Sequence, residues 1–183
     1  MNIELYFLRS SEAFIVQDLL KYAARLDESG ETLTDHPYLE QYYRNYGNYN
    51  GDIGVYAIVD SKIAGGAWSR MLANGFGFVD TQTPELAFAV LPEFRNQGIG
   101  TQIMNQLLSE IAKLYPQVSL AVREDNHAIT LYKRLGFTKI EGSESTNIAG
   151  SISFKMVKKL EEEIPEPQKE SLEERQFKKS FQY

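Results

Sequence analysis

The chain of 183 residues contains no cysteine and only two histidines, His36 and His127. The absence of cysteine excludes disulfide scaffolds, thiolate nucleophiles, iron–sulfur clusters and thiolate zinc sites. Two histidines cannot build a multi-histidine metal centre, so we expect no metal. If the protein is an enzyme, then carboxylates, hydroxyls, backbone amides or a bound cofactor must carry its chemistry.

Basic charge is also scarce, because 19 Lys and Arg stand against 25 Asp and Glu, which gives a net charge of −6. Such a balance provides no long-range attraction for nucleic acid or for an anionic membrane, so we expect neither as a partner. No apolar run approaches the roughly 20 residues that a membrane helix needs. The first nine residues lack the basic and apolar regions of a secretion signal. We therefore expect a cytoplasmic protein.

Hydrophobic periodicity predicts one α/β domain, with a pattern of β-α-α-β-β-β-α-β-α-β-β. The clearest helix has a stripe of Ile99, Ile103, Leu107 and Ile111, which Met104, Leu108 and Leu114 widen. Gly65-Gly66 within a strand predicts a bulge or a close approach of another backbone. The predicted strands are 3–8, 54–59, 63–71, 85–91, 117–122, 137–140 and 152–157, and the predicted helices are 10–23, 36–46, 98–115 and 125–135.

The composition changes near the C-terminus, since residues 161–183 hold seven acidic side chains against four basic ones, together with Pro165 and Pro167. We expect a domain over residues 1–158 and an acidic tail over 159–183. The tail is either disordered or a short amphipathic helix that docks on the domain or on a second subunit. That helix would contain Leu172, Gln176, Phe177 and Phe181, of which the leucine and the two phenylalanines are apolar.

One loop, Pro92 to Thr101, places R-x-x-G-x-G between a strongly apolar strand and the clearest helix. The free N–H groups and the positive dipole end of a helix's first turn form an anion site. Gly98 and Gly100 would let a phosphate approach the backbone, and Arg95 could add a charged contact. Alternatively, the glycine pair only permits a tight strand-to-helix turn. The loop matches neither the P-loop nor the dinucleotide-binding fingerprint.

A second segment, Val122 to Phe137, has a capping region, a short helix and a glycine stop at Gly136. Taken alone, Asn126 is typical of a helix cap, and Tyr132 is typical of an aromatic residue in the core. Together, the two segments strongly resemble the GNAT family of N-acetyltransferases. The first motif is E-L-A-F-A-V-L-P-E-F-R-N-Q-G-I-G-T, and the later one is D-N-x-A-I-x-L-Y-x-x-L-G-F. The resemblance implies an α/β fold with a single mixed, mostly antiparallel sheet flanked by helices.

The resemblance also implies acetyl-CoA as cosubstrate. In this family the preceding strand splays from its neighbour and its backbone pairs with the pantetheine arm, whereas main-chain amides of the glycine loop bind the pyrophosphate. The family's usual asparagine lies seven residues before the tyrosine, where Asp125 stands here, so Asn126 is carried over from a D-N-x-A variant as a pantetheine contact. The implied cofactor-binding residues are Phe88, Ala89, Val90, Arg95, Asn96, Gln97, Gly98, Ile99, Gly100, Thr101 and Asn126.

The implied reaction is direct attack of an amine on the thioester, with Tyr132 as the proton donor to the leaving thiolate. Glu85 corresponds to a glutamate that acts as base in several family members, although a solvent-facing charge at a strand edge is the alternative. Glu124 and Asp125 are weaker candidates for the base. A non-catalytic acyl-CoA-binding sensor or scaffold of the same fold is the competing function.

The acceptor side carries fewer signals. Four tyrosines and His36 in the predicted helix 36–46 either hold a cationic amine by cation–π contact or pack as ordinary core, and we expect Trp68 in the core. The acceptor is a small-molecule or peptide amine, and a homodimer is left open. The four tyrosines are Tyr38, Tyr42, Tyr43 and Tyr46.

Overall fold

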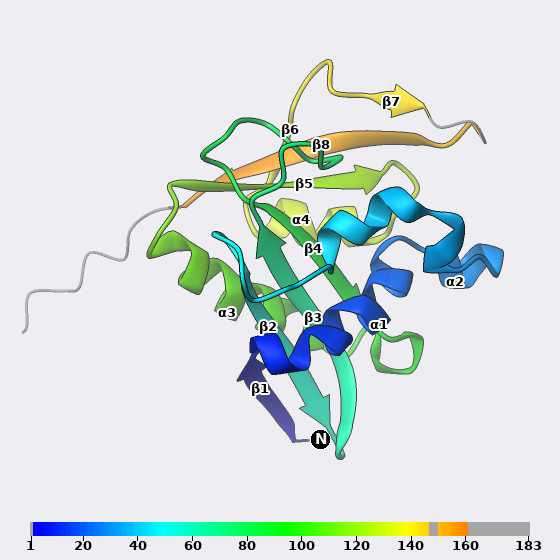
Figure 1. The fold of residues 1–183 in the computed structure, drawn as a ribbon, viewed down its shortest axis with the longest axis vertical. Coiled ribbons are helices and arrows are strands. Elements are labelled where there is room, and N and C mark those ends of the chain that lie inside the picture. Colours follow the sequence, from blue (N-terminus) through cyan, green and yellow to red (C-terminus); the bar gives the residue numbers. More distant parts are fainter. Residues whose placement is uncertain (1, 147–149, 161–183) are drawn as a thin grey trace, which may run out of the picture.

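The computed structural model describes residues 2–146 and 150–160 and contains one eight-stranded sheet. All neighbouring strands pair antiparallel except β4 and β5, which pair parallel. The predicted single mixed, mostly antiparallel sheet is therefore confirmed (Figure 1). Its order is β1 (Ile3–Phe7), β2 (Ile53–Val59), β3 (Lys62–Arg70), β4 (Glu85–Val90), β5 (Gln117–Arg123), β8 (Ile152–Lys159) and β6 (Thr138–Lys139), with β7 (Ser145–Thr146) also on β8.

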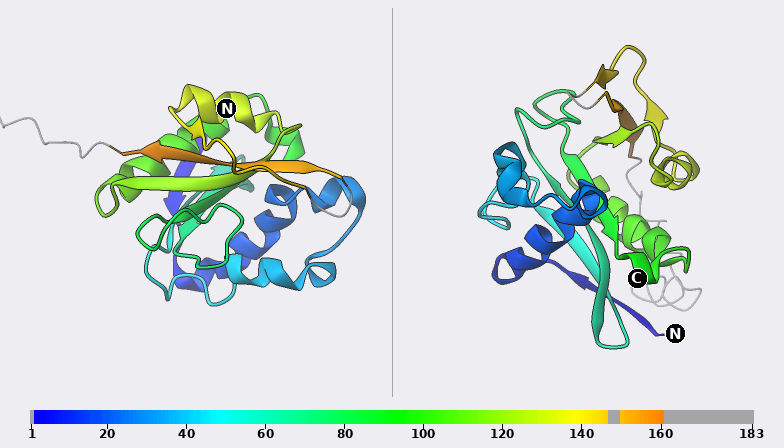
Figure 2. Two further views of the ribbon diagram at one scale, coloured as in Figure 1. Left: turned by 90° about the horizontal axis from the view of Figure 1, so that it is seen from above. Right: turned by 90° about the vertical axis from the view of Figure 1, so that its right-hand side faces the viewer.

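Helices cover both faces of the sheet (Figures 1 and 2). One core cluster joins α3 (Ile99–Ala112) and α4 (Ala128–Arg134) to the sheet, and a second joins α1 (Ala13–Ala23) to the opposite face. Alternate residues of β2 enter the two clusters, as strand geometry requires. The short helices are α2 (Leu26–Ser29) and four 3₁₀-helices, η1 (Ser10–Glu12), η2 (Leu33–Asp35), η3 (Pro37–Tyr42) and η4 (Pro92–Phe94).

The apolar stripe predicted on α3 is buried, and the helix ends at Ala112 rather than at 115. Leu114 lies beyond that end and is 71% exposed, so its predicted place in the core is wrong. In α1, Phe14 is 57% exposed, while Val16 and Leu20 are buried beside the predicted Ile15 and Leu19. Helical period therefore predicts the buried face well and the residues at its margins poorly.

The glycine pair of β3 shows both expected features. A Cβ atom on Gly65 would lie 2.5 Å from the backbone oxygen of Ala89, so a side chain there would collide with β4. The β2–β3 register shifts between Ala57 and Ile58, which leaves Ala64 as the extra residue of a bulge. The end of β4 is thereby packed closely against its neighbour on one side.

The predicted helix 36–46 forms only in part, because the 3₁₀-helix η3 ends at Tyr42 and turns follow it. Arg70 is the physical reason: its Nη1 donates to the backbone oxygens of Gln41 at 3.0 Å and Arg44 at 2.7 Å. In an α-helix that continued to residue 46, the Gln41 carbonyl would instead accept the N–H of residue 45. Asp52 holds the Arg70 guanidinium through two further bonds of 2.7 and 2.8 Å.

Other boundaries differ as well. The predicted loop 26–35 contains α2 and η2, and strand β7 was not predicted. β8 continues to Lys159, and the Leu160 N–H bonds to the Pro116 oxygen at 2.8 Å. The expected acidic tail beyond residue 160 lies outside the described residues. Within residues 2–146 and 150–160, no helix is long and apolar enough to cross a bilayer.

Candidate active site

The parallel strands β4 and β5 separate soon after they meet. Their register contains one pair, Glu85 with Ser119, and the Ser119 N–H bonds to the Pro84 oxygen at 3.0 Å. Beyond that pair a cavity of about 1380 Å³ opens between the two strands. Binding sites for one small molecule commonly measure about 300–1000 Å³, so this cavity has room for two ligands. The splay implied by the family resemblance is therefore present.

The N-terminus of α3 lies at one side of this cavity. Asn96 and Gly98 adopt left-handed conformations, with φ of 60° and 79°. The first helix bond runs from the Gln102 N–H to the Gly98 oxygen at 3.3 Å, so the amides before it have no helix partner. A Cβ on Gly98 would meet nothing within 4 Å, which leaves the turn open to a ligand. An anion can bind there through backbone amides.

Gly100 has a different role, because its Cβ would lie 2.8 Å from the Cζ of Phe88. The position therefore lets the Phe88 ring pack against α3. Arg95 is folded back, with its Nε donating to the Val90 oxygen at 3.0 Å. Gln97, which bonds to a nearby carbonyl, and the buried Ile99 do not line the cavity, whereas the other predicted cofactor-binding residues do.

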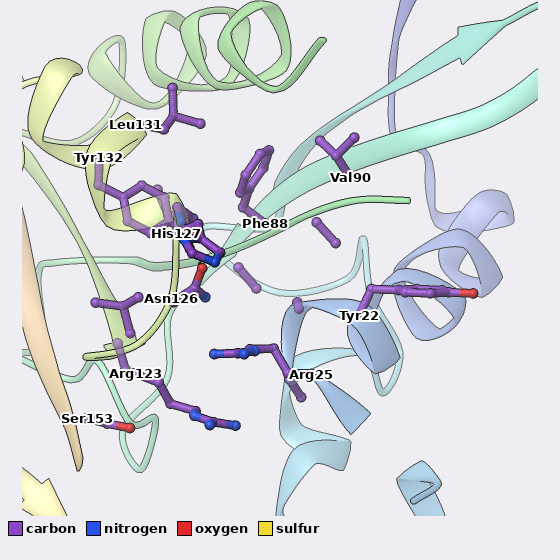
Figure 3. A pocket seen from close by; sticks show the side chains of 18 of the residues that line it. Tyr22, Arg25, Phe88, Val90, Arg123, Asn126, His127, Leu131, Tyr132 and Ser153 are labelled. Carbon is purple, nitrogen blue, oxygen red and sulfur yellow. Dashed lines mark hydrogen bonds between the residues drawn. The ribbon is translucent and has the colours of Figure 1, made fainter. Parts of the chain in front are cut away.

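Tyr132 comes from α4 and lies beside Phe88 in the cavity wall (Figure 3). The two rings meet edge to face, with centroids 6.2 Å apart, and Phe137 packs on Tyr132 at 5.8 Å. The side chain is 6% exposed, and burial raises the pKa of Tyr132 above its ordinary value. Tyr132 is thus both a core aromatic and a cavity residue, and it keeps its proton at neutral pH.

The segment before α4 holds the predicted asparagine and two predicted carboxylates. Asn126 Oδ1 accepts the Ala128 N–H at 2.8 Å, which is a helix-capping contact, and the same side chain lines the cavity (Figure 3). Capping occupies the amide oxygen and leaves the NH₂ group of Asn126 for a ligand. Glu124 is exposed and does not line the cavity, so it is poorly placed to act as a base.

Asp125 is bound by two arginines. Nη1 of Arg25 contacts Oδ1 and Nη2 of Arg123 contacts Oδ2, each at 2.7 Å. Desolvation, which raises the pKa of Asp125, is outweighed by the hydrogen bond from Arg123 and the charges of both arginines, so the net shift is downward. A carboxylate stabilised in this way is a weak proton acceptor.

Arg25 was not predicted as a site residue. It has a φ of 58° between α1 and α2, and Glu28 holds its guanidinium through contacts of 2.8 and 2.6 Å. The contact with Asp125 joins these helices to the segment before α4, near Arg123 (Figure 3). The two residues lie 100 positions apart, and no local pattern signals such a pair.

Glu85 is 4% exposed, so the alternative of a solvent-facing charge at a strand edge is wrong. Tyr42 donates its hydroxyl hydrogen to Glu85 Oε1 at 2.7 Å. Burial raises the pKa of Glu85 to about 6, against the opposing effects of the Tyr42 bond, the Gly77 backbone and the Lys155 charge. Lys155 itself donates to the Phe78 oxygen. Glu85 is therefore a cavity carboxylate whose ionisation falls near neutral pH.

Of the four predicted tyrosines, Tyr38 and Tyr42 line the cavity. Tyr46 instead lies beneath the Arg70 guanidinium, whose Cζ is 5.2 Å from the ring centroid. Tyr43 is partly buried against the core, and Trp68 lies within the core at 1% exposure. Phe76, which was not predicted, meets Tyr38 edge to face at 5.4 Å and stacks on Tyr42 at 6.4 Å. These three rings form an aromatic wall next to Glu85.

Comparison with known families and structures agrees with this geometry. The sequence profile of the acetyltransferase (GNAT) family matches residues 17–137. No curated protein sequence gives a significant match.

Several solved structures share the fold. A GNAT-family acetyltransferase from Streptococcus pneumoniae has a TM-score of 0.64 at 15% identity, covering 87% of this chain and 100% of that one. A ribosomal-protein-alanine N-acetyltransferase from Brucella melitensis has a TM-score of 0.61 at 18% identity, covering 86% of this chain and 99% of that one. A phosphinothricin acetyltransferase from Sinorhizobium meliloti, solved with acetyl-CoA, has a TM-score of 0.60 at 16% identity, covering 87% of this chain and 89% of that one.

Proposed function

Because the chain belongs to the acetyltransferase (GNAT) family and is an acetyl-CoA-dependent N-acetyltransferase, we propose that a primary amine attacks the thioester directly, with Tyr132 as general acid and Glu85 as proton acceptor. One observation carries this proposal. Tyr132 and Glu85 both line the cavity that opens where β4 and β5 separate. The proposed donor on α4 and the proposed acceptor on β4 therefore line one continuous space.

The proposed cofactor half lies between the separated strands and the α3 N-terminus. Beyond Glu85 the register gives β4 no partner on β5, so an extended amide-bearing arm can bond to the backbone of residues 88–90. The free amides of residues 96–101 and the helix dipole suit a pyrophosphate. The NH₂ group of Asn126 is available to the arm, and Arg95 lies at the same rim.

The proposed chemistry assigns one proton to each catalytic side chain. Acetyl-CoA supplies a thioester whose carbonyl carbon forms the new C–N bond as its C–S bond breaks. An alkylammonium with a pKa of about 10 must first lose a proton, and ionised Glu85 accepts it. Tyr132 donates its hydroxyl hydrogen to the departing sulfur, and the second proton that the nitrogen loses as the amide forms restores the Tyr132 hydroxyl. Burial raises the pKa of Tyr132, and it would also raise the pKa of a thiol beside it. The pKa values of the proton donor and of the leaving group therefore shift in the same direction.

We place the acceptor at the aromatic wall of Tyr38, Tyr42 and Phe76, where an ammonium group would also meet the faces of the rings. The printed names of similar structures include both a ribosomal-protein-alanine acetyltransferase and a phosphinothricin acetyltransferase. The fold therefore accommodates protein and small-molecule acceptors alike. For this chain we propose a small-molecule or peptide amine as the acceptor.

The direct test measures free thiol released from acetyl-CoA with 2-phenylethylamine, spermidine, lysine and an alanine-initiated peptide. With the best amine, we expect Tyr132→Phe to lower kcat by about 10²–10⁴-fold, the usual contribution of general acid–base catalysis. Tyr115→Phe is the matched control, since Tyr115 packs on the core away from the cavity. An unchanged rate in Tyr132→Phe would refute its role, and acetyl-CoA binding without turnover on any amine would favour the sensor alternative.

A further inference from the structure

A turn of the β3–β4 connection packs directly on the carboxylate of Glu85. A Cβ atom on Gly75 would lie 1.9 Å from Glu85 Oε2, and one on Gly77 would lie 2.9 Å from its Cδ. The Phe78 N–H closes this turn on the Gly75 oxygen at 3.1 Å. No larger residue fits at Gly75 unless the carboxylate or the turn moves. The pair of glycines is therefore fitted to the acid.

Tyr42 bonds to the carboxylate and to the turn at once. Its hydroxyl donates to Glu85 Oε1 at 2.7 Å and accepts the Phe76 N–H at 2.9 Å. Its ring stacks on the Phe76 ring with planes 10° apart. Tyr42 is 6% exposed, so these bonds are sheltered from competing water. One hydroxyl thus couples the acid on β4, the turn before β4 and the 3₁₀-helix η3.

We propose that Tyr42 is a positioning residue for Glu85, and that Tyr42 together with the turn Gly75-Phe76-Gly77 forms a clamp that fixes the carboxylate for proton acceptance. This inference rests on the proposed function, because it takes Glu85 as the proton acceptor. A clamped carboxylate has one rotamer and one set of partners, so its ionisation depends on those partners.

Two other charged groups face Glu85 from neighbouring elements. Lys155 on β8 favours the ionised form through its positive charge. Arg70 is the register partner of Glu85 on β3, but Asp52 holds its guanidinium. Tyr42 provides the side-chain hydrogen bond to the carboxylate, and that bond favours ionisation. Loss of the Tyr42 hydroxyl should therefore raise the pKa of Glu85.

The test compares pH profiles of kcat/KM for the best amine of the panel in wild type and Tyr42→Phe. We expect the midpoint of the acidic limb to rise by about one pH unit in Tyr42→Phe, as for loss of one hydrogen bond to a charged group. The affinity for acetyl-CoA should stay unchanged. Tyr43→Phe is the matched control, because Tyr43 lies next along the chain and outside the cavity lining. An unmoved midpoint in Tyr42→Phe would overturn the clamp.

Glu85→Gln distinguishes the role of Glu85 as proton acceptor from the role of Tyr42 in the clamp. If the acidic limb disappears in Glu85→Gln but does not move in Tyr42→Phe, the proposed function stands and the clamp fails. If Glu85→Gln keeps the wild-type limb, the base assignment fails and the clamp fails with it.

Gly75→Ala tests the turn without touching Tyr42. Its new Cβ must displace the carboxylate or the turn, and a displacement of about 1 Å can cost about 10²-fold in rate. We expect such a loss of kcat with retained acetyl-CoA binding, which also reports that the variant is folded. Wild-type turnover in Gly75→Ala would contradict the clamp.

Discussion

Two carboxylates of this chain, Glu85 and Asp125, receive opposite treatment from their surroundings. Asp125 is exposed and held by two arginines, which lower its pKa overall. Burial raises the pKa of Glu85 to about 6, although the hydrogen bond from the Tyr42 hydroxyl opposes this shift. Both residues were candidate bases in the sequence. Environment rather than residue type therefore distinguishes the proton acceptor from the structural anion.

The raised pKa of Glu85 predicts a pH-dependent stability. The folded state binds the Glu85 proton more tightly than the unfolded state, so this stabilisation is present below the ordinary carboxyl pKa and is lost as pH rises through about 6. A shift of this size corresponds to on the order of 2 kcal/mol. We expect Glu85→Gln to unfold at higher denaturant concentration than wild type at pH 8, and to lose that advantage near pH 4.5.

Urea unfolding at the two pH values measures this difference. Asp125→Asn is the control, since the pKa of Asp125 is lowered and its loss should destabilise at pH 8. Equal destabilisation by Glu85→Gln at both pH values would show that ionised Glu85 carries no cost.

Individual site residues were predictable where a motif contained them. Tyr132 and the loop 95–101 stand in patterns that resemble a known family, and most of these residues line the cavity. The burial of Glu85 was not predictable, because a charge at the start of a strand can face either water or the core. Phe76 and Arg25 gave no local signal, since their partners come from distant segments.

Among the elements, α3 was predictable and η3 was not, for different physical reasons. The buried residues of α3 repeat at helical period and need only a sheet to pack on. The segment after Pro37 has helix-compatible residues, but Arg70 from β3 donates to the Gln41 carbonyl, which a longer helix would use for its own bond. Such competition by a distant side chain cannot be read from the segment itself.

The turn that begins α3 predicts distinct costs for two substitutions of Gly98. The residue has a φ of 79° and open space around it, so conformation alone opposes a side chain there. We expect Gly98→Ala to destabilise the fold by about 1 kcal/mol and to raise the KM for acetyl-CoA as the amides reorient. Gly98→Asn should cost less, since asparagine tolerates the left-handed region.

Thermal unfolding and acetyl-CoA saturation curves for both variants check this prediction. Equal costs for Gly98→Ala and Gly98→Asn would mean that the left-handed turn is not what requires glycine. An unchanged KM in both would mean that the turn does not contact the cofactor.

At the scale of the molecule, the scarcity of basic residues bears on how the protein binds its own cosubstrate. A net charge of −6 opposes an anionic cosubstrate, so binding must depend on local donors at the α3 N-terminus. The reaction also needs no cysteine, because the reactive sulfur belongs to acetyl-CoA. What links the local features is the splayed β4–β5 pair, which gives donor, acceptor and anion site a common cavity.

The central claim is that acetyl-CoA binds in that cavity. Amide hydrogen exchange with and without acetyl-CoA tests this claim most directly. Amides of a bound loop exchange more slowly because the ligand suppresses local opening. We predict that acetyl-CoA protects the fast-exchanging amides of residues 95–101 and the β4 segment 88–90, with little local change in the β2–β3 turn at 60–61. Protection absent from residues 88–101, or confined to a different part of the fold, would contradict the account.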